Sequence, residues 1–283
     1  MTVHDADEPG WGVDPGDEWG ATVVATVGRQ LKLRREALGL KAGEFGDAIG
    51  YGEDLVYKVE SGKRIPRPEY LDKADKVLKA GGLIAAMKKD VEEVRYPKQV
   101  RDLAKLEARA VEIGVYASHG VHGLLQTEGH ARVLLETRQP AYSQDEVERG
   151  VAARMARRSV FDRSPVPSLS FVLEEAALRR PIGGRMEWRR QLERLLEVGQ
   201  LRNVSLQVMP TGVETHPGLD GGIEVLKFED GTVIGRSAGA FNGRAVSAPK
   251  RVRILELRYG MIRAQALTPR ESLAFVKQVL GET

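Results

Sequence analysis

Apolar positions recur with helical spacing between residues 27 and 94. Within residues 27–61 they stand three and four apart, and glycines follow at positions 39, 50 and 62. Glycine after a last turn, with proline just beyond, is the usual end of a helix. The pattern predicts three short helices over residues 27–38, 41–49 and 53–61, then helices over 70–79 and 83–94. One small core would contain Val27, Leu31, Phe45, Ile49, Leu55, Val56 and Val59.

The spacing over residues 41–61 is that of a helix-turn-helix, in which the second helix enters a DNA major groove. We expect the exposed first turns of that helix to meet base edges and the residues after it to meet phosphates. Lys58 would donate to guanine and a carboxylate would accept from cytosine, whereas phosphate contacts carry no sequence information. The expected base contacts are Glu53, Asp54, Tyr57 and Lys58, and the expected phosphate contacts are Lys63 and Arg64.

After Tyr96-Pro97 the pattern changes to strands that alternate with helices. Apolar runs predict strands over residues 111–118, 168–173, 204–209, 222–228 and 232–235, with a tight turn at Asp230-Gly231 between the last two. Helices are predicted over 98–110, 144–161, 186–198, 250–266 and 269–280, and residues 119–137 should form a loop that leads into a helix. We therefore expect an α+β fold class, an all-α five-helix amino-terminal domain followed by a mixed α/β domain.

The charge is distributed unevenly. Residues 1–20 hold six of the 40 acidic residues and none of the 43 basic ones, so the rest of the chain carries a formal charge of +9. We interpret residues 1–20 as a disordered acidic tail, residues 21–95 as the DNA-binding domain and residues 96–283 as an effector and dimerisation domain. A basic body favours a polyanion partner, although a generally Arg-rich composition would explain the charge equally well.

Other classes of protein are disfavoured by what the chain lacks. It has no cysteine, hence no disulfide or thiolate metal site. It has no run of about 18 apolar residues and no visible signal peptide. No G-x-S-x-G or Ser/Lys arrangement indicates a nucleophile. We therefore expect a cytoplasmic protein that is neither a membrane protein nor an enzyme and that needs no cofactor.

The second half still offers polar residues for a pocket. His119-x-x-His122, with Glu128 or Glu174, is half of a metal pattern, but flanking glycines favour loop or pocket histidines, and we expect no metal. Glu174 and Glu175 would form an acid/base pair or, as we prefer, hold an arginine such as Arg154 or Arg158. The loop at His216 is glycine-rich without the spacing of a phosphate loop. The expected ligand or partner pocket comprises His122, Gln126, Arg158, Glu174 and His216.

Residues 27–66 resemble the phage-repressor-like (Xre/Cro) helix-turn-helix class, above all in the closing V-E-S-G-K-R-x-P at 59–66. The resemblance implies that Arg35 pairs with Glu60, either holding the arginine near a phosphate or serving as a plain structural salt bridge. Two departures are visible. Ala42 stands where many relatives have a phosphate-gripping glutamine, and Glu53-Asp54 stands where neutral polar residues are usual. The two carboxylates also suit a helix N-terminus.

Blocks of the second half resemble the large carboxy-terminal domain, of uncharacterised function, of many actinomycete Xre-type, antitoxin-like regulators. With the helix-turn-helix they cover nearly all of residues 25–280. His122 replaces a usual proline, and residues 237–247 depart from the pattern. The blocks are GLLQTE at 123–128, RMARR at 154–158, EEAALRRPIGG at 174–184, LQVMP at 206–210, HPGLDG at 216–221 and ALTPRES at 266–272.

Together these features predict a DNA-binding transcriptional regulator. It would bind double-stranded DNA as a homodimer, and its second domain would dimerise and sense a small protein, encoded nearby, or a small ligand. One alternative is an antitoxin-like protein that sequesters a small partner and binds DNA only for autoregulation. Another is a ligand-binding or hydrolytic domain tethered to DNA. The operator, the effector and the direction of regulation are not encoded in any pattern that we recognise.

Overall fold

The computed structural model describes residues 11–13, 17–95, 98–237 and 245–283. The chain divides into two compact units, one formed by residues 1–102 with 138–153 and the other by residues 103–137 with 154–283. The first unit thus includes a segment, residues 138–153, that lies outside the predicted amino-terminal domain. The mixed α/β fold class predicted from the sequence is confirmed.

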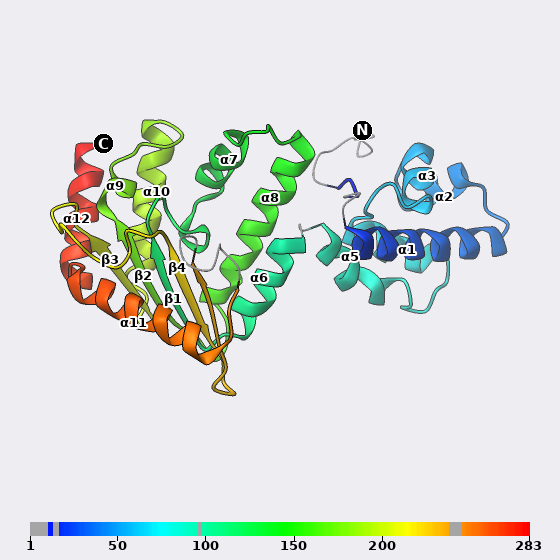
Figure 1. Ribbon diagram of the computed structural model, residues 1–283. Helices are drawn as coiled ribbons and strands as arrows, with labels where there is room; N and C mark the ends of the chain where they lie inside the picture. The colour runs from blue at the N-terminus through cyan, green and yellow to red at the C-terminus, as the bar shows by residue number, and fades with distance from the viewer. Residues whose placement is uncertain (1–10, 14–16, 96–97, 238–244) are drawn as a thin grey trace. The chain divides into compact units, whose positions relative to one another are not determined.

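The first unit contains a helical bundle around the predicted helix-turn-helix (Figure 1). Its first helix begins at Glu18 rather than at residue 27, because Val24 continues the buried stripe of Val27 and Leu31 toward the amino end. The predicted last helix is split into a 3₁₀ turn and a short α-helix. The elements are α1 Glu18–Ala37, α2 Ala42–Ile49, α3 Glu53–Glu60, α4 Pro68–Val77, η1 Ala85–Met87 and α5 Lys88–Val94.

Two glycines allow these helices to pack closely. A Cβ on Gly28 of α1 would lie 2.4 Å from the carbonyl oxygen of Val59, so α1 approaches the end of α3 only without a side chain there. A Cβ on Gly46 would lie 2.6 Å from the carbonyl oxygen of Tyr51 in the turn between α2 and α3. Gly46 costs α2 about 1 kcal/mol of helix propensity relative to alanine, and in return it permits the tight turn.

Part of the predicted acidic tail has a defined position, so the expectation of disorder over residues 1–20 is wrong for residues 11–13 and 17–20. The carbonyl oxygen of Trp11 accepts a hydrogen bond from the Ile65 N–H at 2.9 Å, and Gly12 forms an isolated β-bridge with Arg64. The Trp11 ring lies under the guanidinium groups of Arg67 and Arg95, at 5.4 and 4.3 Å. The contacts of the Trp11 ring thus hold in place a segment that has few other apolar side chains. Residues 1–10 and 14–16 lie outside the described residues.

The second unit is built on a five-stranded sheet with the order β3-β2-β1-β4-β5. β1, β2 and β3 are parallel, while β4 and β5 are antiparallel to their neighbours and form the predicted hairpin. Each strand lies within about two residues of its predicted bounds. The strands are β1 Glu112–Ala117, β2 Ser168–Glu174, β3 Val204–Met209, β4 Ile223–Lys227 and β5 Val233–Ser237.

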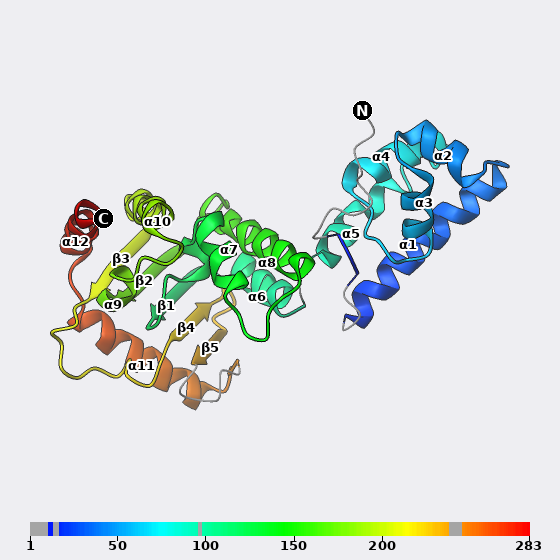
Figure 2. The same cartoon turned by 90° about the horizontal axis from the view of Figure 1, so that it is seen from above.

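Helices cover both faces of this sheet, which Figure 2 shows from above. On one face Leu169 and Phe171 pack with Trp188 and Leu192 of the helix Arg185–Val198 (α10). On the other face Val172 and Tyr116 pack with the helix Pro249–Gln265 (α11). The remaining elements are α6 Lys98–Arg109, η2 Gly123–Leu125, α7 Glu128–Glu136, α8 Gln144–Ala156, η3 Arg157–Phe161, α9 Glu175–Leu178 and α12 Pro269–Glu282.

The helix predicted over residues 144–161 changes to a 3₁₀ helix at Arg157. In the described residues, no helix has the length and apolar character needed to cross a membrane.

Candidate nucleic-acid interface and pocket

The helix α3 presents one polar face to solvent. Glu53, Asp54 and Tyr57 are exposed, the last at 55%, while Leu55, Val56 and Val59 are buried in the core of the unit. Lys58 is partly exposed and its Nζ lies 2.8 Å from Asp54 Oδ2, one turn earlier on the same face. The four residues predicted to meet bases therefore share the solvent side of α3.

The acidic start of α3 is close to α2. A Cβ on Gly43 would be 3.6 Å from the Glu53 carboxyl carbon. Helix N-termini attract anions, and in a helix-turn-helix the start of the first helix faces phosphate. The Glu53 carboxylate places a negative charge beside the start of α2, and this charge lowers the electrostatic attraction for DNA.

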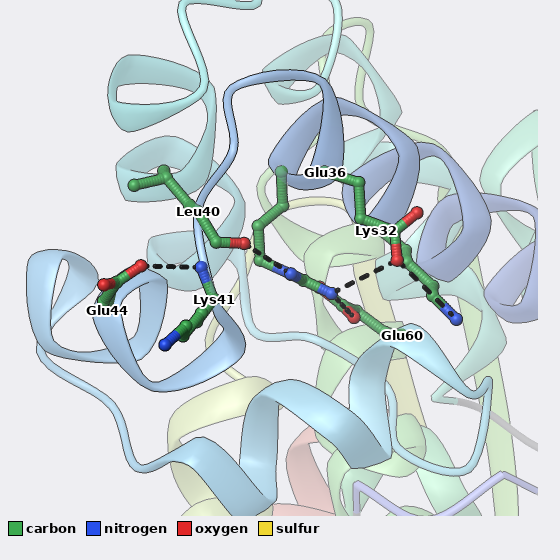
Figure 3. A network of polar contacts seen from close by, with 7 residues as sticks. Lys32, Glu36, Leu40, Lys41, Glu44 and Glu60 are labelled. Atoms are coloured by element: carbon green, nitrogen blue, oxygen red, sulfur yellow. Dashed lines mark hydrogen bonds and ion pairs between the residues drawn. The ribbon is translucent and has the colours of Figure 1, made fainter.

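Arg35 and Glu60 form a buried bidentate ion pair. Arg35 Nε and Nη2 donate to the two Glu60 oxygens at 2.6 and 2.9 Å, and Nη1 donates to the Leu40 carbonyl oxygen at 2.6 Å (Figure 3). The hydrogen bonds that Arg35 donates to Glu60 raise the pKa of Arg35. Arg35 is only 6% exposed, so the predicted phosphate contact does not fit this structure, and the pair joins α1 to the end of α3.

Lys63 and Arg64, both predicted to contact phosphates, differ in exposure. The Lys63 side chain is exposed, whereas Arg64 is 9% exposed and its backbone pairs with Gly12. The expectation that Arg64 faces the DNA backbone is therefore wrong for this structure, because the segment around Trp11 lies beside it. Lys63 remains a predicted phosphate contact.

The second unit has a pocket of about 440 Å³ where the carboxyl end of β1 meets the start of β4, its antiparallel neighbour in the sheet. Its walls include residues 115–119 at the carboxyl end of β1, residues 222–224 at the start of β4 and residues 236–237 at the end of β5. From β1 the chain continues to β2 and β3 on one side and reaches β4 on the other. Ligands of α/β sheets usually bind at such a reversal, outside the carboxyl ends of the parallel strands. We call this site the β1–β4 pocket.

Three arginines line the β1–β4 pocket. Arg154 Nη1 donates to Gln126 Oε1 at 2.7 Å, and Gln126 Nε2 donates to the Val121 carbonyl oxygen, which fixes the amide orientation. Arg157 donates two hydrogen bonds to the buried Glu107, at 2.7 and 2.6 Å. Arg236 lies 3.4 Å from Glu224, its direct neighbour across the β4–β5 pair. The guanidinium groups are thus held from three different directions.

The charge of these arginines acts on His122 in the same pocket. Burial, together with Arg157, Arg154 and Arg236, lowers the pKa of His122 to about 3, so the ring is neutral near pH 7. Its Nδ1 accepts from the Leu124 N–H at 3.4 Å, which leaves the proton on Nε2. Burial also raises the pKa of Glu224, whose Oε1 accepts no hydrogen bond from the described residues.

Glu107, His122 and Glu224 bring three possible metal-ligand atoms within 4.8 Å of one another. The surrounding bonds do not suit a cation. Both oxygens of Glu107 already accept from Arg157, and the protonated Nε2 of His122 faces Glu224 at 3.9 Å. Three nearby guanidinium groups add repulsion. The donor set fits an anion better than a metal ion.

Glu174 and His216 lie apart from the pocket lining and contact Tyr116. Tyr116 Oη donates to Glu174 Oε1 at 2.5 Å, and His216 Nε2 lies 3.4 Å from the same oxygen. His216 Nδ1 accepts from the Gly218 N–H at 3.1 Å, so Nε2 carries the proton. Hydrogen bonding to Glu174 adds to burial in raising the pKa of Tyr116. This arrangement anchors the loop at His216 to the sheet.

The structure does not bear out the expectation that Glu174 or Glu175 holds Arg154 or Arg158. Glu175 does hold an arginine, but it is Arg179, at 2.7 Å, because Arg179 directly follows α9 and lies one turn after Glu175. Arg158 contacts Met155 Sδ and is outside the β1–β4 pocket. Of the five predicted pocket residues, only His122 and Gln126 line it.

Sequence reasoning missed Glu107, Arg157, Glu224 and Arg236 as a group. A signal was present for two of them: Leu226 and Ile234 face the core, so Glu224 and Arg236, two residues away on neighbouring strands, are charged residues at core-facing positions. Charged groups at such positions are paired or functional. The Glu107–Arg157 contact spans 50 residues and has no local signal.

Two family models match the chain. One, described as a helix-turn-helix domain, matches residues 26–86. The other, a domain of unknown function (DUF5753), matches residues 100–278. Searches of the curated proteins and of the solved structures found no match. The chain carries a helix-turn-helix domain ahead of its sheet unit, and it belongs to the DUF5753 family.

Proposed function

We propose that this protein is a sequence-specific DNA-binding transcriptional regulator of the Xre type that acts in the cytoplasm. The observation that carries the proposal is the exposed face of α3 on a helix-turn-helix scaffold, with Tyr57 at 55% exposure and Lys58 beside it. A second helix of this kind reads base edges in the major groove. The exposed Lys63 at its end supplies a phosphate contact.

The protein acts as a homodimer in this proposal. Glu53 and Asp54 are exposed at the start of α3 and reduce its attraction for DNA, and Arg35 and Arg64 are buried. One copy therefore offers few cationic contacts, and two copies on half-sites about one DNA turn apart would double them. The second unit supplies dimerisation and receives the signal, from a small protein or a small ligand.

The test is selection of DNA fragments by the full-length protein, followed by sequencing of the bound DNA and measurement of its affinity. A palindromic or near-palindromic motif supports the proposal, and binding without any enriched motif contradicts it. Lys58→Ala should change the preferred base at one position of each half-site, by about 1–3 kcal/mol of discrimination. Lys76→Ala on α4, an exposed lysine that we place outside the interface, is the charge-matched control.

A further inference from the structure

We propose that the β1–β4 pocket binds a small organic anion, through a phosphate or carboxylate group that Arg154, Arg157 and Arg236 hold. The inference deepens the proposed function, since it names the chemical class of the signal that the second unit receives, and it rests on that function only for its regulatory meaning. The binding itself is a property of the second unit alone.

The first argument is that these arginines are fixed in place. Glu107 holds Arg157 by two hydrogen bonds, and Gln126, itself anchored on the Val121 carbonyl oxygen, orients Arg154. Gly123 leaves room for both, because a Cβ there would meet Arg157 Nη1 at 3.2 Å. Guanidinium groups in fixed positions bind planar or tetrahedral oxyanions with little loss of side-chain entropy.

The second argument is the charge balance of the pocket. Arg157 and Glu107 neutralise each other, and Arg236 reaches Glu224 only at 3.4 Å, which is a long contact for an ion pair. Burial also raises the pKa of Glu224, which weakens its compensation of the Arg236 charge. An anion that enters beside Arg236 would complete the balance in a partly buried site, where Coulomb attraction is stronger than in water.

The third argument concerns the groups around the anion. Glu224 Oε1 is buried and accepts no hydrogen bond from the described residues, so a donor on the ligand, a hydroxyl or an amine, fits against it. Val115 and Ile223 form an apolar part of the wall. With a volume of about 440 Å³ the pocket is in the range of metabolite-sized ligands. The ligand class is therefore a small phosphate or carboxylate that also carries a hydrogen-bond donor.

The test uses the full-length protein at constant ionic strength with four probes: inorganic phosphate, glycerol 3-phosphate, citrate and neutral glycerol. Titration calorimetry and the melting temperature report binding. We expect at least one anion to bind and to raise the melting temperature by about 3 °C at saturating concentration, while glycerol does neither. Glycerol 3-phosphate against citrate separates a phosphate from a carboxylate ligand. Absence of binding by all three anions would overturn the inference.

Variants assign the binding to this pocket. Arg154→Met and Arg236→Met should each weaken binding about tenfold or more, because each removes a charged hydrogen bond. Arg154→Lys should recover part of the loss and shows that the site is still folded. Arg190→Met, at an arginine 65% exposed on α10, is the control. Equal affinity in all four variants places the anion elsewhere, and equal affinity of wild type for the two phosphates overturns the role of Glu224.

Measuring DNA binding with the same protein preparations distinguishes failure of the regulator proposal from failure of the anion-binding proposal. An enriched DNA motif without anion binding leaves the regulator standing and ends the pocket inference. Anion binding that depends on Arg154, without any DNA motif, supports the pocket and contradicts the regulator.

Discussion

The guanidinium of Arg35 and the carboxylate of Glu60 meet in a bidentate contact that is closed to solvent. It joins the last turn of α1 to the last residue of α3, and the third donor of Arg35 holds the Leu40 carbonyl oxygen just before α2. One arginine thus fixes the orientation of both helices of the DNA-binding pair.

Removing one partner of this contact should destabilise the first unit. Glu60→Leu leaves the Arg35 charge buried without its carboxylate, and we expect the free energy of unfolding to fall by about 3–5 kcal/mol. Urea unfolding followed by circular dichroism measures it. Glu36→Leu removes a half-exposed carboxylate on α1, next to Arg35 in the sequence. This change should lower the free energy of unfolding by less than about 1 kcal/mol. Equal losses in the two variants would contradict a structural role for the pair.

Alanine variants of Lys63 and Arg64 should differ in how DNA affinity depends on salt concentration. Lys63 is exposed and Arg64 is buried beside Gly12. Lys63→Ala should weaken binding to all sequences and reduce the slope of log affinity against log salt by about 0.9, the value of one phosphate contact. Arg64→Ala should leave the slope unchanged and lower thermal stability instead. An unchanged slope in Lys63→Ala would show that this lysine contacts no phosphate.

Trp11 should contribute to the stability of the helix-turn-helix unit. Its ring packs against two guanidinium groups, and its carbonyl oxygen binds the Ile65 N–H. Trp11→Ala should reduce the free energy of unfolding by about 2 kcal/mol, from lost apolar burial and lost cation–π contacts. Trp19→Ala, at a tryptophan 45% exposed on α1, should change it by less than about 0.5 kcal/mol. A smaller effect at Trp11 than at Trp19 would contradict the packing described.

His130 should make the second unit sensitive to acid. Both ring nitrogens are buried against Trp188 without a partner among the described residues, and burial lowers the pKa to about 4 from an ordinary 6.5. Above pH 6.5 neither the folded nor the unfolded state binds the proton. Below pH 6.5 His130 binds a proton in the unfolded state but not yet in the folded state. The free energy of unfolding therefore falls progressively down to about pH 4.

Between pH 7.5 and 5 this loss amounts to about 2 kcal/mol. His130→Leu should flatten the dependence of unfolding free energy on pH in this interval, as measured by urea titrations at several pH values. His119→Leu, at an exposed histidine, should keep the slope of the wild type. A variant at 130 with an unchanged slope would rule out His130 as the source.

The sequence predicted those parts of the fold that have local signals. Glycines after α2 and before the loop at Lys63 ended helices where expected, and Asp230-Gly231 closed the hairpin. The start of α1 was missed, because Asp17 and Glu18, which mark it, belong to a run of six acidic residues among glycines and prolines that was interpreted as a tail. The position of Trp11 was missed for a different reason: it depends on residues 64–67, more than 50 positions away.

The candidate sites were predictable to unequal degrees. The exposed residues of α3 follow from helical periodicity alone, since Leu55, Val56 and Val59 fix the buried side. Pocket residues need tertiary contacts: Arg154 donates to Gln126 rather than to Glu174 or Glu175, and Glu174 faces Tyr116 rather than an arginine. Sequence identifies polar residues in the loops but does not say which of them converge.

The β-bridge between Gly12 and Arg64 has a practical consequence for purification of this protein with an affinity tag. An affinity tag joined ahead of residue 1 is at most ten residues from Trp11, a reach of about 35 Å. It would therefore be tethered near Arg64 and the adjacent Lys63, which we propose to contact phosphate. Cleaving such a tag before the binding measurement keeps steric obstruction from being mistaken for weak DNA affinity.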